Sequence, residues 1–436
     1  MSASTNRLAL AWSALSRTAR GDNSASMDKF NPHSVGFLFV VISVIGLAVI
    51  PGLINYLNVK HTSPAGVNLE PFPRVANLVA AGFVLVVCVA VAFVRGHPDR
   101  NLTGLVVLLL ALIVPYIFSP ALPGAADLVR IAIAVAVFVA VWNIAPSVDG
   151  LKWVALSGAV FGAYSILGAV INPEHMMFQA KSTKALIADV NLAGPFMHSN
   201  VLGIYCVLAL ALTPLLANIP LRILTGLIII ATIVGSASRT ALVATGVLGL
   251  WWTICWFRSV VSIRFAGTVV ACMCAAAVAA IPLLGLGSKT LSGRGQIWTG
   301  SLKAWHESPL VGLGLTFFKS QRRPELYIDY EYIGSGHNLL IQTLVTSGLV
   351  GLCFLMTVLF AALRSTRALV VTRDQIACFG YLIVFLAVST TEAVWEILPN
   401  LELFPVVGLV FLVIIVARRD AGQLQDGILS ETHLHD

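Results

Sequence analysis

The sequence predicts an all-α polytopic membrane protein with about twelve transmembrane helices and one large outer loop containing short helices. The first observation is compositional: 58% of the residues are hydrophobic and only 11% are charged, against about 25% charged residues in an average soluble domain. A soluble chain of 436 residues could not bury so much apolar surface, so lipid must cover it. The second observation is a series of long apolar runs that recur along most of the chain.

Twelve of these runs are candidates for transmembrane helices, because a helix needs about 20 apolar residues to cross the hydrocarbon core. The seventh and the twelfth runs are short. An even number of spans places both termini on the same side of the membrane. The runs cover approximately residues 36–56, 76–94, 102–121, 125–146, 152–171, 199–217, 221–235, 239–257, 264–285, 338–363, 376–396 and 401–417.

Positively charged residues predict on which side the termini lie. Cytoplasmic loops are enriched in Lys and Arg, and most cations of the short connections share a side with the N-terminus. The chain then divides into a cytoplasmic extension (1–34), nine helices (35–285), an outer loop (286–337), three helices (338–417) and a cytoplasmic tail (418–436). This arrangement accounts for the net charge of +7 without a nucleic-acid partner, and no nucleic-acid-binding module is recognisable. The cytoplasmic cations are Arg7, Arg17, Arg20, Lys29, Arg95, Arg100, Lys152, Arg222, Arg258, Arg264, Arg364, Arg367, Arg373, Arg418 and Arg419.

A second group of cations lies on the outer side, which suggests an anionic ligand there. Arg239, in a tight turn between two spans, and Arg294, in a Gly-rich segment, have the strongest case, because an arginine at membrane level usually has a partner. For any single loop lysine, ordinary solvation is the simpler interpretation. The outer loops add Lys181, Lys184, Arg322 and Arg323 as candidate substrate-binding residues.

The outer loop contains one predicted amphipathic helix. Arg294, Trp298, Leu302 and Trp305 recur at helical spacing, and tryptophan commonly anchors a helix at the membrane interface. We therefore expect this helix to lie on the outer leaflet, with Trp298 as a candidate substrate contact. Arg294 begins the helix, where free backbone N–H groups favour a phosphate, so this end is a candidate pyrophosphate site.

The loop ends in Gly334-Ser335-Gly336, followed by His337 and Asn338 at the start of the next span. Histidine has the side-chain pKa nearest neutrality, so His337 is a candidate general base. Capping of the helix or simple solvation is the alternative interpretation. Asn338 is a candidate substrate-binding residue.

Further polar residues are expected at the same outer level. His198 and Asn200 open the sixth span, and Glu392 and Glu396 lie one helical turn apart near the end of the eleventh. His198, Asn200 and Glu392 are candidate substrate-binding residues. The glutamates could pair with Arg239 or Arg294, or orient a catalytic group. A metal site is not expected, because the acidic pair Asp329 and Glu331 stands alone among basic residues.

The order of these motifs resembles the O-antigen ligase and O-antigen polymerase superfamily of bacterial envelope glycosyltransferases. The resemblance covers roughly residues 190–415; the five spans before it match only in being hydrophobic, and residues 317–333 match no subgroup. The motifs are Phe196-x-His198-x-Asn200-x-x-Gly203, Ser236-x-Ser238-Arg239-Thr240-Ala241, Gly293-Arg294-x-x-x-Trp298, Pro309-x-x-Gly312-x-Gly314, His337-Asn338-x-x-x-Gln342 and Gly348-x-x-Gly351.

The resemblance implies a GT-C-type fold and transfer of a glycan from undecaprenyl diphosphate, at the periplasmic face of the bacterial inner membrane. For an O-antigen ligase the acceptor is a sugar hydroxyl of lipid A–core, and neither a metal nor another cofactor takes part. By position, His337 matches the catalytic histidine, and Arg239 and Arg294 match the diphosphate-binding arginines. An O-antigen polymerase or a protein O-oligosaccharyltransferase remains an alternative within the superfamily. A transporter or flippase is the alternative outside it, although the unusual charges gather at the outer face rather than at the midplane.

Overall fold

The computed structural model describes residues 32–58, 71–94, 96–97, 100–117, 124–179, 190–196, 198–285, 293–319, 327–328, 331–332, 334–395 and 402–417. This part of the chain is mainly helical, as predicted. The α-helices are α2 (Pro32–Asn58), α3 (Pro71–Ala92), α4 (Leu102–Ile117), α5 (Ala125–Ile144), α6 (Lys152–Ile171), α7 (Pro173–Met176), α8 (Ser199–Ala211), α9 (Ile219–Ser236), α10 (Arg239–Trp256), α11 (Ile263–Ala280), α12 (Arg294–Trp305), α13 (Leu339–Ala368), α14 (Thr372–Ser389) and α15 (Gly408–Val416).

Short elements join these helices. The 3₁₀ turns are η1 (Val148–Leu151), η2 (Thr213–Leu215), η3 (Ile281–Leu283) and η4 (Phe317–Lys319). The strands form two small antiparallel pairs. In the first, β1 (Met177–Gln179) pairs with β2 (Val190–Leu192), with Met177 opposite Leu192. In the second, β3 (Tyr327–Ile328) pairs with β4 (Glu331–Tyr332), with Tyr327 opposite Tyr332.

Each of the twelve predicted apolar runs contains a helix, but their lengths differ. Within the described residues, eight helices are long and apolar enough to cross a membrane: α2, α3, α5, α6, α9, α11, α13 and α14. The other four depart from the prediction of twelve full spans. Helices α4 and α8 are apolar but have 16 and 13 residues, and α15 has nine. Helix α10 has 18 residues but begins with Arg239 and carries three tryptophans.

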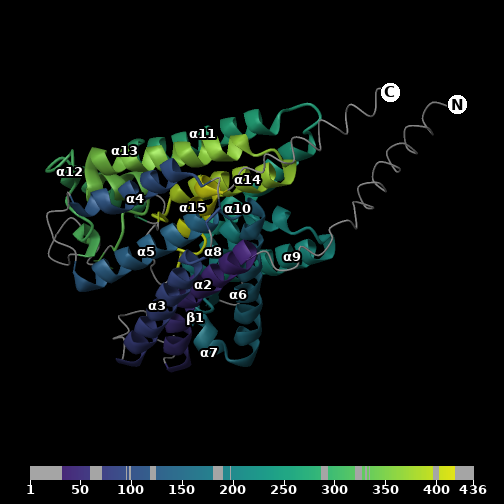
Figure 1. Ribbon diagram of the computed structural model, residues 1–436. Helices are drawn as coiled ribbons and strands as arrows, with labels where there is room; N and C mark the ends of the chain where they lie inside the picture. The colour runs from purple at the N-terminus through teal and green to yellow at the C-terminus, as the bar shows by residue number, and fades with distance from the viewer. Residues whose placement is uncertain are drawn as a thin grey trace, which may run out of the picture.

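The helices form one bundle, in which α11, α13 and α14 lie alongside one another and α12 lies against one end of α13 (Figure 1). Most of α14 is buried, whereas most residues of α3, α9 and α11 are not. A helix that is apolar on all sides and exposed in this way faces lipid. The bundle therefore has an inner layer around α14 and an outer layer that meets the membrane.

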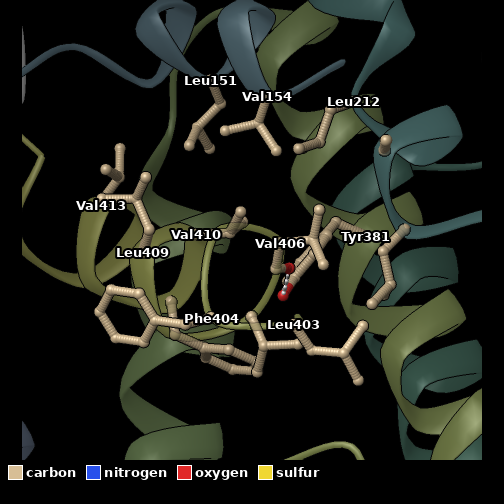
Figure 2. Close-up of a cluster of buried hydrophobic side chains, with 14 of the residues drawn as sticks. Leu151, Val154, Leu212, Tyr381, Leu403, Phe404, Val406, Leu409, Val410 and Val413 are labelled. Carbon is tan, nitrogen blue, oxygen red and sulfur yellow. Dashed lines mark hydrogen bonds between the residues drawn. The ribbon is translucent and has the colours of Figure 1, made fainter. Parts of the chain in front are cut away.

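Helix α15 shows how a short helix fits inside this bundle. All nine of its residues are buried, and it packs against α4, α5 and α13. A helix of nine residues is about 14 Å long, so the preceding residues continue the run as non-helical backbone. The hydroxyl of Tyr381 donates to the carbonyl of Val406 at 2.7 Å, which satisfies one of the backbone groups that lipid could not. Figure 2 shows this region, with Leu409, Val410 and Val413 of α15 facing Leu151 and Val154.

Helix α13 is interrupted at Gly348, where the backbone is not helical (φ 61°, ψ −161°). The segment from Pro309 to Gly314 lies against this break. Leu313 N–H donates to the carbonyl of Val345 at 2.7 Å, and Leu349 N–H donates to the carbonyl of Pro309 at 3.0 Å. The hydrogen bonds lost inside the helix are thus replaced by bonds to the loop. A Cβ atom on Gly348 would lie 2.3 Å from the Leu310 carbonyl oxygen, so the close approach requires glycine.

Helices α10 and α14 run antiparallel and connect the two ends of the bundle. At one end the hydroxyl oxygens of Thr240 and Thr391 lie 2.8 Å apart. At the other end the indole N–H of Trp251 donates to the carbonyl of Ile376 at 3.0 Å. Each helix has 18 residues and is therefore about 27 Å long, close to the roughly 30 Å thickness of the hydrocarbon core.

Candidate functional site

Arg294 is placed by the start of α12. Gly293 caps this helix with φ 88°, a left-handed conformation that glycine adopts without steric cost. The chain therefore turns abruptly into the helix at Arg294. The guanidinium Nη2 of Arg294 lies 2.5 Å from Oε1 of Glu392, and the Arg294 side chain is 18% exposed.

Helix α12 itself differs from the predicted interfacial helix. Trp298 is 1% exposed and packs with Phe317, Phe318 and Val345, and its indole N–H donates to the carbonyl of Gly336 at 3.1 Å. The tryptophan side of the helix thus contacts protein rather than the outer leaflet, because α13 and the following loop cover it. A role of Trp298 in substrate binding remains a prediction. Its hydrogen bond to the Gly336 carbonyl supports the backbone next to His337.

His337 is held by its neighbours on both sides. Gly336 N–H donates to the side chain of Gln342 at 2.7 Å, and Asn338 caps α13 by accepting from Ile341 N–H at 3.0 Å. His337 has φ 44°, which is uncommon for a residue other than glycine, although histidine tolerates it better than most. Such a conformation persists only where the surroundings impose it, and it often marks a functional site.

Asn338 is completely buried and joins three elements. Its amide donates to the carbonyls of Val278 and Thr390, both at 3.0 Å. These contacts tie the start of α13 to α11 and to the end of α14. The side-chain amide hydrogens are therefore engaged within the protein, so a contact of Asn338 with substrate remains a prediction that the geometry does not support.

Glu392 connects His337 to Arg294. It follows α14, and its N–H donates to the carbonyl of Val388 at 3.0 Å, which continues the last helical turn. The residue is 9% exposed. Its Oε2 lies 3.0 Å from His337 Nδ1, while its Oε1 contacts Arg294. The pairing of Glu392 with Arg294, one of the two arginines expected from the sequence, is confirmed.

This arrangement defines which nitrogen of His337 can act as a base. A carboxylate can only accept hydrogen bonds, so the Nδ1–H of His337 donates to Glu392. The Nε2 atom then carries the lone pair, and the carboxylate stabilises the imidazolium that forms when Nε2 takes a proton. The site can therefore accept a proton from a hydroxyl group placed at Nε2.

Arg239 lies at the same end of the bundle. It is exposed and begins α10, whose capping residue Ser238 accepts from Ala241 N–H at 3.4 Å. The adjacent Thr240 contacts Thr391, the residue before Glu392. Thr240 belongs to the motif around Arg239, but Thr391 belongs to no motif and lies 151 positions away, so the sequence did not predict their contact.

The start of α8 adds His198 and Asn200 to this end. Nδ1 of His198 accepts from Asn200 N–H at 3.0 Å, so His198 caps the helix. One turn further on, a Cβ on Gly203 would lie 2.7 Å from the Ser236 hydroxyl and from Ser238 Cβ. Gly203 thus lets α8 approach the turn that precedes Arg239. The expectation that these residues share one level is supported.

Other candidates lie outside the described residues: Lys181, Lys184, Arg322, Arg323, Asp329 and Glu396. Within the part of the chain that the structure covers, no group of three or more His, Cys, Asp or Glu side chains could hold a metal ion.

The fold and the site together define a polytopic α-helical membrane protein with a charged site at one end of its helix bundle. Residues 224–356 match the family model of the O-antigen ligases, which confirms the family resemblance for the stretch from α9 into α13. Arg239, Arg294 and His337 lie inside the matched stretch and Glu392 lies after it. No curated protein matches the chain.

Proposed function

We propose that the protein is an inverting O-antigen ligase, which transfers a glycan from undecaprenyl diphosphate to a sugar hydroxyl of lipid A–core. On this proposal it is a GT-C-type enzyme of the bacterial inner membrane, with its site at the periplasmic face. The observation that carries the proposal is Glu392, which contacts both the candidate base His337 and the candidate phosphate ligand Arg294. On this proposal, proton acceptance and binding of the leaving group take place in one site.

In the proposed reaction, the acceptor hydroxyl oxygen attacks the anomeric carbon. The bond from that carbon to the diphosphate oxygen breaks, and the lipid diphosphate leaves with the electron pair. Nε2 of His337 takes the hydroxyl proton, a role typically worth 10²–10⁴-fold in rate. A single attack inverts the anomeric configuration, through a transition state with oxocarbenium character.

Arg239 and Arg294 would stabilise the departing diphosphate, replacing a metal ion in this role. Arg239 is exposed at the same end of the bundle. Arg294 is paired with Glu392, so the diphosphate would share or replace this carboxylate as its partner. If Arg294 moved to the diphosphate, the negative charge of Glu392 would be available to stabilise the imidazolium of His337.

The test is a transfer assay with purified protein, lipid-linked glycan and a chelator. Wild-type protein should glycosylate lipid A–core, and His337→Ala should be at least 10²-fold slower. Arg239→Ala and Arg294→Ala should weaken donor use. Full activity of all three variants would contradict the mechanism.

The choice of acceptor separates the related functions. Transfer to a pilin-type protein but not to lipid A–core would make the enzyme a protein O-oligosaccharyltransferase. Extension of the lipid-linked glycan itself would make it a polymerase. Movement of lipid-linked glycan across the membrane by His337→Ala at the wild-type rate, without transferase activity in either protein, would indicate a flippase.

A further inference from the structure

A cavity of about 720 Å³ lies at the end of the bundle opposite His337. It opens between α9 and α10 beside the first turns of α14, where Trp251 contacts Ile376. The two ends of the bundle are about 27 Å apart along α10, so the cavity is not part of the site around His337. Its walls are formed by Leu210, Thr213, Pro214, Arg222, Ile223, Gly226, Leu227, Ile230, Trp252, Cys255, Trp256, Arg258, Arg373 and Ile376.

Most of this wall is apolar and faces the membrane. Ile223 is 56% exposed, Leu227 is 61% exposed and Trp256 is 86% exposed. Exposed side chains of this kind on membrane-spanning helices contact lipid acyl chains. The cavity is therefore a groove that is open to the hydrocarbon layer, with a width set in part by Gly226, which has no side chain.

Arginines give the groove a strong positive charge. Within the described residues, no carboxylate pairs with Arg222 or Arg258. Arg222 is held by two hydrogen bonds from its guanidinium to the Leu216 carbonyl. Arg373 is paired with Asp149 and Asp374, so the excess charge comes from Arg222 and Arg258. Two positive charges that line the same cavity repel each other, and an anion bound between them would offset this repulsion.

We propose that this groove binds one anionic phospholipid, with its phosphate between Arg222 and Arg258 and an acyl chain along the apolar wall of α9 and α10. Basic pockets between transmembrane helices on the cytoplasmic side bind anionic lipid head groups, and the predicted orientation places the groove on that side. The lipid would fill the space between the two helices and hold the end of α10 that is remote from Arg239. The binding does not depend on the reaction that the protein catalyses.

Native mass spectrometry of the full-length protein, titrated with phosphatidylglycerol or phosphatidylcholine, tests the head-group contacts. Wild-type protein should retain phosphatidylglycerol preferentially. Arg222→Gln/Arg258→Gln should bind it about thirtyfold more weakly, the combined effect of two arginines near an anionic head group. The matched control is Arg364→Gln/Arg367→Gln, which removes two exposed arginines of the same predicted side that do not line the groove; it should bind as wild type.

A second pair of variants tests the acyl-chain contact without changing any charge. Gly226→Phe fills the groove, whereas Gly249→Phe adds the same ring to α10 where a new Cβ meets nothing within 4 Å. The first should lose phosphatidylglycerol and the second should retain it. The proposal would be overturned if Arg222→Gln/Arg258→Gln and Arg364→Gln/Arg367→Gln lost phosphatidylglycerol equally, or if wild-type protein retained phosphatidylglycerol and phosphatidylcholine equally. Displacement of phosphatidylglycerol by inorganic phosphate would also overturn it. Circular dichroism of every variant confirms that the protein remains folded.

Discussion

Glu392 is shared between two partners with different chemical needs. Arg294 requires a full negative charge, whereas His337 requires an acceptor that fixes its tautomer. The carboxylate is 12% exposed, and electrostatic interactions are stronger in such a partly dry setting than in water. Removal of Glu392 would leave a partly buried guanidinium without its counter-charge, which is usually costly.

Glu392→Gln separates the charge of this residue from its shape. The amide oxygen can still accept from His337 Nδ1–H, but it cannot stabilise an imidazolium or neutralise Arg294. We expect the rate of glycan transfer to fall by about 10²-fold or more, by analogy with general-base catalysis. The measurement is kcat in the transfer assay, together with thermal unfolding to verify the fold.

The double variant Glu392→Gln/His337→Ala shows whether the two residues act together. If Glu392 acts through His337, the double variant should be scarcely slower than His337→Ala alone, because residues that work as a unit are not additive. Multiplication of the two losses would mean that Glu392 supports catalysis by another route, and the positioning role would be abandoned.

At the scale of elements, the break in α13 is the feature on which the outer loop depends. The segment Pro309–Gly314 bonds to the carbonyls of Val345 and Thr346, and α12 packs on α13 through Trp298. Together these contacts fix the loop at both of its inner edges. The position of His337 therefore depends on backbone packing that lies eleven residues further along the chain, at Gly348.

Gly348→Ala should destabilise the protein strongly. The new methyl group would lie 2.3 Å from the Leu310 carbonyl oxygen, and φ 61° is unfavourable for alanine. We expect a loss of about 2–5 kcal/mol in the free energy of unfolding, measured as a lower Tm in detergent. Gly246→Ala is the matched control, because its Cβ would meet nothing within 4 Å and alanine favours a helix. A Tm of Gly348→Ala equal to that of the control would show that the break is not under steric constraint.

Helix α12 and the segment from Pro309 to Gly314 show what a sequence pattern cannot predict. The spacing of Arg294, Trp298 and Trp305 correctly predicted α12, but periodicity does not reveal whether the apolar side meets lipid or protein. The pattern Pro309-x-x-Gly312-x-Gly314 predicted a turn, yet not its contact with Gly348. Such contacts join backbone segments about 35 positions apart, and only the folded chain brings them together.

At the scale of the whole molecule, composition was sufficient to predict a helical membrane protein, since 58% hydrophobic residues admit few other solutions. The position of a helix within each apolar run was also predictable. The length of each helix was not, because α15 is short for a tertiary reason: Tyr381 satisfies the backbone at Val406 and permits non-helical chain inside the bundle. For Glu392, the sequence left the partner open between Arg239, Arg294 and a catalytic group, so it did not predict that Arg294 and His337 both contact it.

The distribution of cations predicts the orientation of the bundle, and this orientation decides which of the two ends faces outward. Thr316 is exposed beside α12, at the end that carries His337. Ser259 is exposed after α10, at the end that carries the groove. If the positive-inside arrangement holds, an impermeant maleimide should label Thr316→Cys in intact spheroplasts and label Ser259→Cys only after permeabilisation.

The background should lack the seven native cysteines, of which Cys272 and Cys353 are exposed. The reverse labelling pattern would place His337 in the cytoplasm, where lipid-linked glycans are assembled rather than transferred to lipid A–core, and the ligase proposal would fail with the orientation. Labelling of both positions in intact spheroplasts would instead contradict a membrane-spanning path for α11, which lies between them in the chain.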